Sequence, residues 1–308
     1  MQIISGTTTF QLNKPSAVAI GKFDGIHKGH MALLQEILRQ KRQGLQAVVF
    51  TFDPLPDIFF GGRPCKLLST DQEKHRLLEE LGVDVLVEYP LTKESASVSP
   101  EKFVTEILVK QMKMAYIAAG YDLSFGDKGK GNAALLKKMA PACGYEVSVI
   151  DKICLGEREV SSTYVREAVA EGNMELATSL LGREYLILST VRHGQRLGHV
   201  IGMPTMNLIP EEEKLLPPYG VYFSESLVNG AWYKGVTNIG MRPTVSSEPK
   251  VTVETFLFDF DADIYDETVG VKLHHYSRAE MRFENVEALS ARMHEDAREA
   301  ADYFTCHS

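Results

Sequence analysis

The sequence has little cysteine, no long hydrophobic run and no excess of positive charge. Its four cysteines lie far apart and form no CxxC pair, which favours reduced thiols over a disulfide scaffold or a zinc site. No apolar run approaches the ~18 residues of a membrane span, and the N-terminus lacks the basic-then-apolar order of a signal peptide. The net charge of −8 argues against general binding to nucleic acid or acidic membranes. We therefore expect a cytoplasmic protein with no nucleic-acid or membrane partner, in which a local cluster of donors must hold any anionic substrate.

What the sequence has is a regular alternation over its first half. Residues 16–21 and 46–52 are short apolar runs typical of buried strands, and residues 30–44 between them have helical spacing and end at Gly44. Strand–helix–strand order recurs three times up to residue 150, which predicts a doubly wound parallel sheet. A helical stretch over residues 161–182 closes this half.

The second half has the pattern of an antiparallel β structure. Four segments with strand patterns begin at Tyr185, and Asn229–Gly230 is a hairpin signal inside the second of them. Helical periodicity returns only at residues 285–304, behind a possible Asn285 cap. We expect residues 1–184 to form an α/β domain, and residues 185–308 to form a small antiparallel β-barrel or sandwich with a terminal helix.

The segment GKFDGIHKGH, residues 21–30, stands between the first predicted strand and its helix. It therefore lies at the carboxyl edge of the sheet, where a helix N-terminus attracts phosphate. Its spacing fits neither GxGxxG nor GxxxxGK[ST]. His27 and His30 can both donate to one phosphate and stabilise the charge that develops on it, and Gly29 would allow close backbone approach. Isolated histidines are more often surface or core residues, and HxxH without a third ligand is a poor zinc site, but the glycine-rich strand end favours catalysis.

This segment resembles the GxFDGxHxGH signature of nucleotidyltransferases, and most closely the FMN adenylyltransferase half of bacterial bifunctional riboflavin kinase/FAD synthetases. TFDPLP (51–56), GYDLSFGDKGKGN (120–132) and VSSTYVREAV (160–169) resemble further motifs of that family in the same order. The resemblance implies catalysis by His27 and His30, and binding of ATP by Gly21, Phe23, Asp24, Ser161, Ser162, Thr163 and Arg166. Alone, the SSTYVRE segment would be interpreted as an ordinary capped helix.

The resemblance also implies a flavin pocket in this half. It assigns to that pocket Asp53, Pro54, Pro56, Phe60, Asp122 and Phe125. Two positions depart from the family pattern, since Leu55 stands where histidine is usual and Ser124 where arginine is usual. The loss of a ring and a cation there could weaken FMN binding, whereas the nucleotide motifs are intact.

In the second half, the Pro-Thr-x-Asn sequence at residues 204–207 places a hydroxyl and an amide oxygen two residues apart on an extended chain. Thr205 and Asn207 can therefore point the same way and bind one Mg²⁺, which prefers oxygen ligands. The alternative is a strand that begins after a proline turn. Strand alternation also puts Glu254, Phe256 and Phe258 on one face, with a solvent-facing strand residue as the alternative for Glu254.

The order of these segments resembles the riboflavin kinase family: GHVIGMPTMNL (198–208), YKGVTNIGMRPT (233–244), VETFLFDFDADIY (253–265) and SRAEMRF (277–283). The resemblance implies that Thr205 and Asn207 contact Mg-ATP, that Glu254 is the catalytic base and that Arg278 lies near the flavin. His199 departs from the pattern, because arginine is frequent there and histidine is not permanently charged.

The resemblance covers nearly the whole chain and implies a bifunctional enzyme: an N-terminal doubly wound nucleotidyltransferase domain and a C-terminal riboflavin kinase barrel. With ATP and Mg²⁺, riboflavin would be converted to FMN, and FMN to FAD with release of pyrophosphate. The alternatives are a single retained activity, another acceptor for the adenylyl group, or a flavin-binding regulator without turnover. Flavoprotein clients and self-association stay open.

Overall fold

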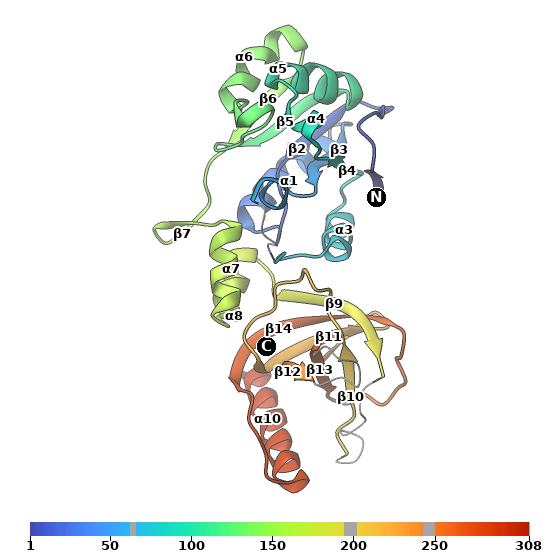
Figure 1. Ribbon diagram of the computed structural model, residues 1–308, viewed down its shortest axis with the longest axis vertical. Coiled ribbons are helices and arrows are strands. Elements are labelled where there is room, and N and C mark those ends of the chain that lie inside the picture. Colours follow the sequence, from blue (N-terminus) through green and yellow to red (C-terminus); the bar gives the residue numbers. More distant parts are fainter. Residues whose placement is uncertain (62–65, 194–201, 243–249, 308) are drawn as a thin grey trace. The chain divides into compact units, whose positions relative to one another are not determined.

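The computed structural model describes residues 1–61, 66–193, 202–242 and 250–307. The chain divides into two compact units, which are described one at a time (Figure 1). The first comprises Met1–Lys66 and Lys74–Ser162, and the second comprises Leu67–Glu73 and Thr163–Ser308. Within the described ranges, no helix has the combined length and apolarity that a bilayer crossing requires.

The first unit contains a six-stranded sheet in which every pairing is parallel, as the alternating pattern predicts. In spatial order its strands are β1 (Gln2–Ser5), β4 (Val85–Pro90), β3 (Gln46–Asp53), β2 (Ser16–Ile20), β5 (Met114–Gly120) and β6 (Glu146–Ile150). The chain passes from β2 outward to β3 and β4 on one side, and to β5 and β6 on the other. The carboxyl end of β2 is therefore the switch point at which such sheets bind ligands.

Helices cover both faces of this sheet (Figure 1). They are α1 (Lys28–Lys41), α2 (Pro56–Gly61), α3 (Asp71–Glu80), α4 (Lys93–Ala96), α5 (Pro100–Lys102), the π-helix η1 (Phe103–Gln111), the 3₁₀ turn η2 (Asp127–Gly129) and α6 (Ala133–Cys143). Two short strands, β7 (Cys154–Leu155) and β8 (Arg158–Glu159), form a separate hairpin. The sequence predicts one regular helix over residues 100–112, whereas Met112 N bonds Ile107 O at 3.0 Å, the five-residue step of a π-helix.

The core of the first unit forms two layers because side chains alternate along each strand. Val18 and Ile20 of β2 pack on the side of η1 and α6, and Ala17 and Ala19 pack on the side of α1. Most strand residues in both layers are apolar, and β2 is buried along its whole length. This is the doubly wound arrangement that the sequence predicts, and it holds the β2–α1 connection on a rigid base.

The second unit is a closed antiparallel barrel, which decides between the barrel and the sandwich. Its strands follow the order β10 (Thr205–Leu208), β13 (Lys250–Leu257), β12 (Ala231–Arg242), β11 (Gly220–Val228), β14 (Thr268–Ala279) and β9 (Tyr185–Arg192). Asn229 and Gly230 join β11 to β12 with φ of 49° and 81°, the left-handed pair that an Asn-Gly hairpin requires.

Among the described residues, the helices of the second unit are α7 (Ser162–Ala170), α8 (Met174–Leu181) and α10 (Val286–Cys306). Asn285 caps α10 as predicted, since its side chain accepts a hydrogen bond from Ala288 N at 2.8 Å. From α10, Ala300 and Phe304 pack on Phe223 of the barrel. Val286, in the first turn of α10, is 43% exposed.

A buried ion pair attaches residues 67–73 to the second unit. Lys214 Nζ donates to Glu73 Oε2 at 2.6 Å, to Leu68 O at 2.8 Å and to Leu186 O at 2.7 Å. Glu73 Oε1 in turn accepts from Leu188 N at 2.9 Å. The charged groups of Glu73 and Lys214 thus bond each other and backbone groups. Residues 67–73, from the first half of the sequence, are therefore a structural part of the second unit.

Candidate active sites

The loop between β2 and α1 is held by burial of its apolar side chains. Phe23 and Ile26 are fully buried although their φ angles are 50° and 41°, in the left-handed region that side chains other than glycine disfavour. Gly25 has a φ of 79°. The core contacts of the two apolar residues therefore fix a folded backbone at the end of β2, directly before the two histidines.

The two histidines stack on each other at the start of α1. His27 is the N-cap residue and is 8% exposed, and its ring centroid lies 3.9 Å from that of His30 at an interplanar angle of 23°. The Phe23 ring lies 5.0 Å from His30. A Cβ on Gly29 would come within 3.1 Å of the His27 ring, so this glycine leaves room for the ring itself. The structure thus brings together the two imidazoles that the sequence predicts as a pair.

The serine-rich segment lies against the same loop. Ser162 Oγ donates to Asp24 O at 3.0 Å, and Asp24 is itself buried. Val160 O lies 3.6 Å from the position of a Cβ on Gly29. Two motifs that are more than a hundred residues apart in sequence therefore meet at this switch point. Ser161 immediately precedes α7, and Thr163 and Arg166 lie on its first turns.

The predicted flavin residues of the first half fall into two groups. Asp53 and Pro54 are exposed at the carboxyl end of β3, joined by a cis peptide bond, and Pro56 begins α2. Farther along α2, Phe60 is 68% exposed. Of the glycine-rich loop residues, Asp122 is exposed, whereas Phe125 is 3% exposed and packs its ring 5.3 Å from that of Phe103 in the core.

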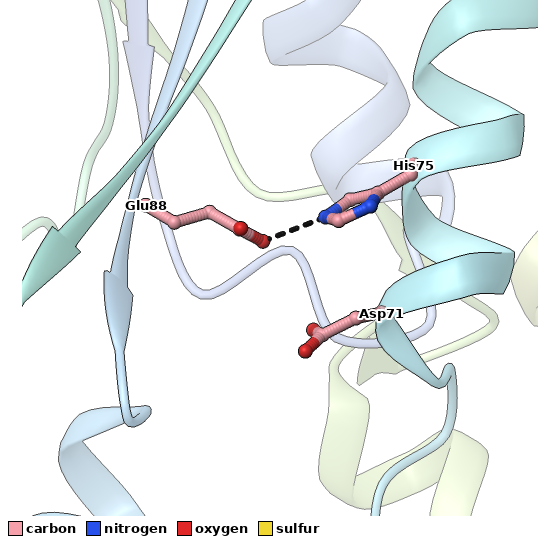
Figure 2. A group of neighbouring side chains, drawn as sticks. All are labelled: Asp71, His75 and Glu88. Carbon is pink, nitrogen blue, oxygen red and sulfur yellow. Dashed lines mark hydrogen bonds and ion pairs between the residues drawn. The ribbon is translucent and has the colours of Figure 1, made fainter. Parts of the chain in front are cut away.

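A histidine–carboxylate pair lies on the opposite side of β3 from β2. His75 Nε2 lies 2.9 Å from Glu88 Oε1 (Figure 2). Lys74 Nζ lies 3.1 Å from the same oxygen. Figure 2 also shows Asp71, which precedes His75 by one turn of α3. Because Glu88 already has a lysine and an imidazole beside it, we interpret this pair as a structural ion pair and assign no metal to it.

In the barrel, strand register places three polar residues side by side. Glu254 of β13 is opposite Asn207 of β10 and opposite Asn238 of β12. Thr252 Oγ1 donates to Glu254 Oε1 at 3.2 Å from the same face of β13. Since directly paired residues of antiparallel strands share a face, a carboxylate flanked by two amides forms one polar row on the outer wall of the barrel.

A cavity of about 280 Å³ lies over this row, between the barrel wall and α10. Its polar lining includes Thr205, Asn238, Thr252, Glu254, Arg278, Glu280 and Asp296, and its apolar lining includes Met203, Val221, Val236, Met241, Phe256, Met281, Phe283, Leu289 and Met293. Glu254 and Phe256 both face it, which agrees with the predicted strand alternation. A polar row beside a larger apolar surface suits an amphipathic ligand with hydroxyl groups and an aromatic ring.

Arg278 is fixed at this cavity by the C-terminal helix. Its Nε and Nη2 donate to the two carboxylate oxygens of Asp296 at 2.8 and 2.6 Å. Asp296 is 2% exposed, and Arg292 Nη2 lies 2.9 Å from its Oδ1. This bidentate geometry leaves little freedom to the guanidinium plane.

Thr205 also lines a second cavity, of about 320 Å³, beside the first. Pro204, Met206, Thr255 and the loop of residues 260–265 form its other walls. The threonine therefore stands where two ligand-sized spaces meet. His199, the position that departs from the family pattern, lies outside the described residues.

Both halves of the chain match models of known families. A model described as FAD synthetase matches residues 9–164, and one described as riboflavin kinase matches residues 181–304. Proteins named bifunctional riboflavin kinase/FMN adenylyltransferase match along nearly their whole length: that of Listeria monocytogenes is 34% identical over 93% of this chain and 92% of its own, and that of Haemophilus influenzae is 34% identical over 99% of both. The chain belongs to the bifunctional riboflavin kinase/FMN adenylyltransferase family.

A solved structure supports the fold of this family member over both units. The crystal structure described as a macrolide-efflux protein from Streptococcus pneumoniae superposes with a TM-score of 0.82, at 29% identity over 96% of each chain. The name macrolide-efflux protein refers to the Streptococcus pneumoniae protein only.

Sequence reasoning did not identify four polar residues that line the cavity: Asn238, Thr252, Glu280 and Asp296. Asn238 lies within a segment quoted for its resemblance, and only strand pairing shows that it faces Glu254. Thr252 could have been found from strand alternation, because it lies two residues before Glu254 and therefore on the same face of the strand. Asp296 gives no local signal, since its partner Arg278 lies on another element.

Proposed function

We propose that the two halves of the chain carry out two successive reactions. Residues 185–308 transfer the γ-phosphate of ATP to riboflavin and give FMN, and residues 1–184 join AMP from a second ATP to FMN and release FAD and pyrophosphate. The support is that two family models cover the two halves and that full-length relatives carry both names. A single retained activity and a regulator without turnover are disfavoured, because both models match.

The observation that carries the kinase assignment is the paired row of Asn207, Glu254 and Asn238, of which Glu254 and Asn238 line the cavity. The primary hydroxyl of the ribityl chain binds beside Glu254, and the isoalloxazine ring binds against the apolar wall and Arg278. Glu254 accepts the hydroxyl proton as the oxygen attacks the γ-phosphorus, and the bond to the β–γ bridging oxygen breaks so that ADP leaves. ATP occupies the adjoining cavity, with Thr205 between the two ligands.

The donor set at Thr205 and Asn207 fits Mg²⁺. Asn207 Nδ2 lies 3.4 Å from Thr205 O, so the amide oxygen is the atom that can bind a cation, together with the threonine hydroxyl. Two neutral oxygen ligands match an ion that keeps most of its coordination for water and phosphate. When bound, Mg²⁺ would neutralise charge on the ATP phosphates.

In the first half, we propose that His27 and His30 donate to the α-phosphate of ATP. The FMN phosphate is already anionic and needs no base, so catalysis there consists of positioning and charge stabilisation. Ser161, Ser162, Thr163 and Arg166 contribute hydroxyls, N–H groups and a guanidinium at the start of α7, and Gly21, Phe23 and Asp24 shape the loop. The flavin segments proposed are residues 53–60 and 122–125. We also propose a cytoplasmic location and small-molecule partners only.

The test is product analysis with purified protein. Wild-type protein given riboflavin, ATP and Mg²⁺ should form FMN and then FAD. Glu254→Gln should lower FMN formation by roughly 10²- to 10⁴-fold, the usual contribution of a general base, and should still convert supplied FMN to FAD. The matched control is Glu225→Gln, a partly exposed carboxylate on β11 that pairs with His274 and does not line the cavity. Normal phosphorylation by Glu254→Gln would overturn the kinase site.

A further inference from the structure

Methionine is concentrated around the flavin cavity proposed above. Of the eleven methionines in the chain, all of which lie among the described residues, four line this one cavity: Met203, Met241, Met281 and Met293. They come from four separate segments, namely the stretch before β10, strand β12, the stretch after β14 and helix α10. Thioethers contact aromatic rings favourably and adapt to an irregular outline, so this wall suits a flat ring system.

The exposure of these methionines separates two of them from all others. Met241 is 51% exposed and Met281 is 56% exposed, whereas the other nine are buried or half-buried. The two exposed thioethers of the chain therefore both lie at the rim of the same cavity. Met203, by contrast, is 3% exposed and belongs to its interior.

Exposure decides which thioethers react with peroxide. A hydroperoxide transfers one oxygen atom to sulfur: the O–O bond breaks, an S–O bond forms, the sulfur is oxidised by two electrons, and hydrogen peroxide is reduced to water. The product, methionine sulfoxide, is polar and no longer fits against an apolar ring, and it can be reduced back enzymatically. Oxidation at the rim would thus exchange two apolar ring contacts for two polar groups.

We propose that Met241 and Met281 form an oxidation-sensitive rim through which hydrogen peroxide lowers riboflavin affinity and so restrains FMN formation. The proposal rests on the placement of the flavin in this cavity. It does not extend to adenylyl transfer, because the methionines of the first unit, Met1, Met31, Met112, Met114 and Met139, are buried or half-buried. Peroxide should therefore act on one activity of the enzyme and spare the other.

The experiment treats the full-length protein with hydrogen peroxide, then with dithiothreitol to reverse cysteine oxidation, and locates added oxygen by peptide mass spectrometry. Met241 and Met281 should oxidise before the other methionines. The KM for riboflavin should then rise about tenfold, the size expected for loss of two sulfur–aromatic contacts. The kcat of phosphorylation and the conversion of FMN to FAD should change less than twofold. Methionine sulfoxide reductases should restore the original KM.

The variants are compared by the ratio of KM after treatment to KM before it. Met241→Leu/Met281→Leu removes both reactive sulfurs and should bring this ratio close to one, whereas the matched control Met139→Leu, on α6 of the first unit, should behave like the wild type. The proposal is wrong if rim sulfoxides form without a change in KM, or if the double variant is as sensitive as the wild type. This failure differs from failure of the proposed kinase site, since untreated Glu254→Gln tests that site without any oxidation.

Discussion

The two proposed sites of this chain differ in what holds their reacting groups. In the first unit the histidines lie on a loop and a helix N-terminus, positioned by ring stacking and by the buried side chains of Phe23 and Ile26. In the second unit Glu254 lies in the middle of a strand, with paired strands on both sides. A site on a strand receives its geometry from backbone ladders, whereas a site on a loop depends on a few side-chain contacts.

The difference also reflects the chemistry that each site is proposed to perform. The attacking FMN phosphate is already charged before the reaction. The first site therefore needs hydrogen-bond donors that stay in contact with the phosphate groups as they react. The attacking hydroxyl of riboflavin is neutral, so the second site needs a fixed carboxylate beside a ring-binding wall. Substitutions of the histidines at the first site should therefore lower the reaction rate with little effect on folding, whereas substitutions around the second cavity should lower both stability and substrate binding.

The strongest test of this separation is His30→Ala. Loss of one donor to the developing phosphate charge should lower FAD formation by roughly 10²- to 10³-fold, while FMN still accumulates from riboflavin. The measurement is chromatographic separation of flavins after incubation with ATP and Mg²⁺. Loss of both products from a folded variant would contradict the division into two sites.

Asp296→Asn in the second unit should lower both the stability of that unit and the binding of riboflavin. Removing one charge from a buried pair costs about 3 kcal/mol or more, so the second unit should unfold at lower temperature and denaturant concentration. Arg278 would also lose its fixed orientation, and the KM for riboflavin should rise more than kcat falls. Glu295→Gln on the same helix is the matched control, because the Glu295 side chain is 45% exposed beside Arg292, whereas Asp296 is buried. If the two substitutions lowered stability and raised KM equally, the buried Arg278–Asp296 pair would contribute no more than the more exposed Arg292–Glu295 pair.

Local features of this fold could be predicted from the sequence because their signals are local. The Asn285 cap and the Asn229–Gly230 hairpin each depend on neighbouring residues, and both are present. The continuous apolar run of β2 likewise predicted a buried strand, and alternation along β13 predicted that Glu254 and Phe256 share one face. The stacking of His27 on His30 follows from their three-residue spacing at a helix start.

Long-range features could not be predicted in the same way. An apolar ring in a glycine-rich loop can line a pocket or fill a core, and only the packing against Phe103 shows that Phe125 is buried. The ion pair between Glu73 and Lys214 joins residues that are 141 positions apart, and no periodic pattern in the sequence predicts it. The cavity itself arises where α10 covers the barrel, which no single segment encodes.

Gly29→Ala would sharpen the contrast between the two sites with a small steric change. The added methyl carbon would come within 3.1 Å of the His27 ring and displace it from its partner, while the helix position itself accepts alanine. Adenylyl transfer should fall about tenfold through misplacement of one donor, with thermal stability unchanged or slightly increased. Gly61→Ala is the control, since a Cβ there has no neighbour within 4 Å. Normal transfer by Gly29→Ala would mean that the stacked geometry is not needed.

The smallest effect concerns the helix that carries His30. The Arg39 guanidinium, together with the Tyr116 hydroxyl, lowers the pKa of Glu36 from 4.5 to about 2. A carboxyl group whose pKa is lower in the folded state stabilises folding above its unfolded pKa, and this contribution is lost as the pH falls towards the folded value. Glu36→Gln should therefore lower the Tm at pH 7 by a few degrees, and the gap to the wild type should narrow between pH 4.5 and pH 3. Glu80→Gln, which breaks an exposed pair with Arg76, should leave the Tm nearly unchanged throughout. A gap for Glu36→Gln that stays constant with pH would show that the charge of this carboxylate does not anchor α1, and that loop contacts alone position His30.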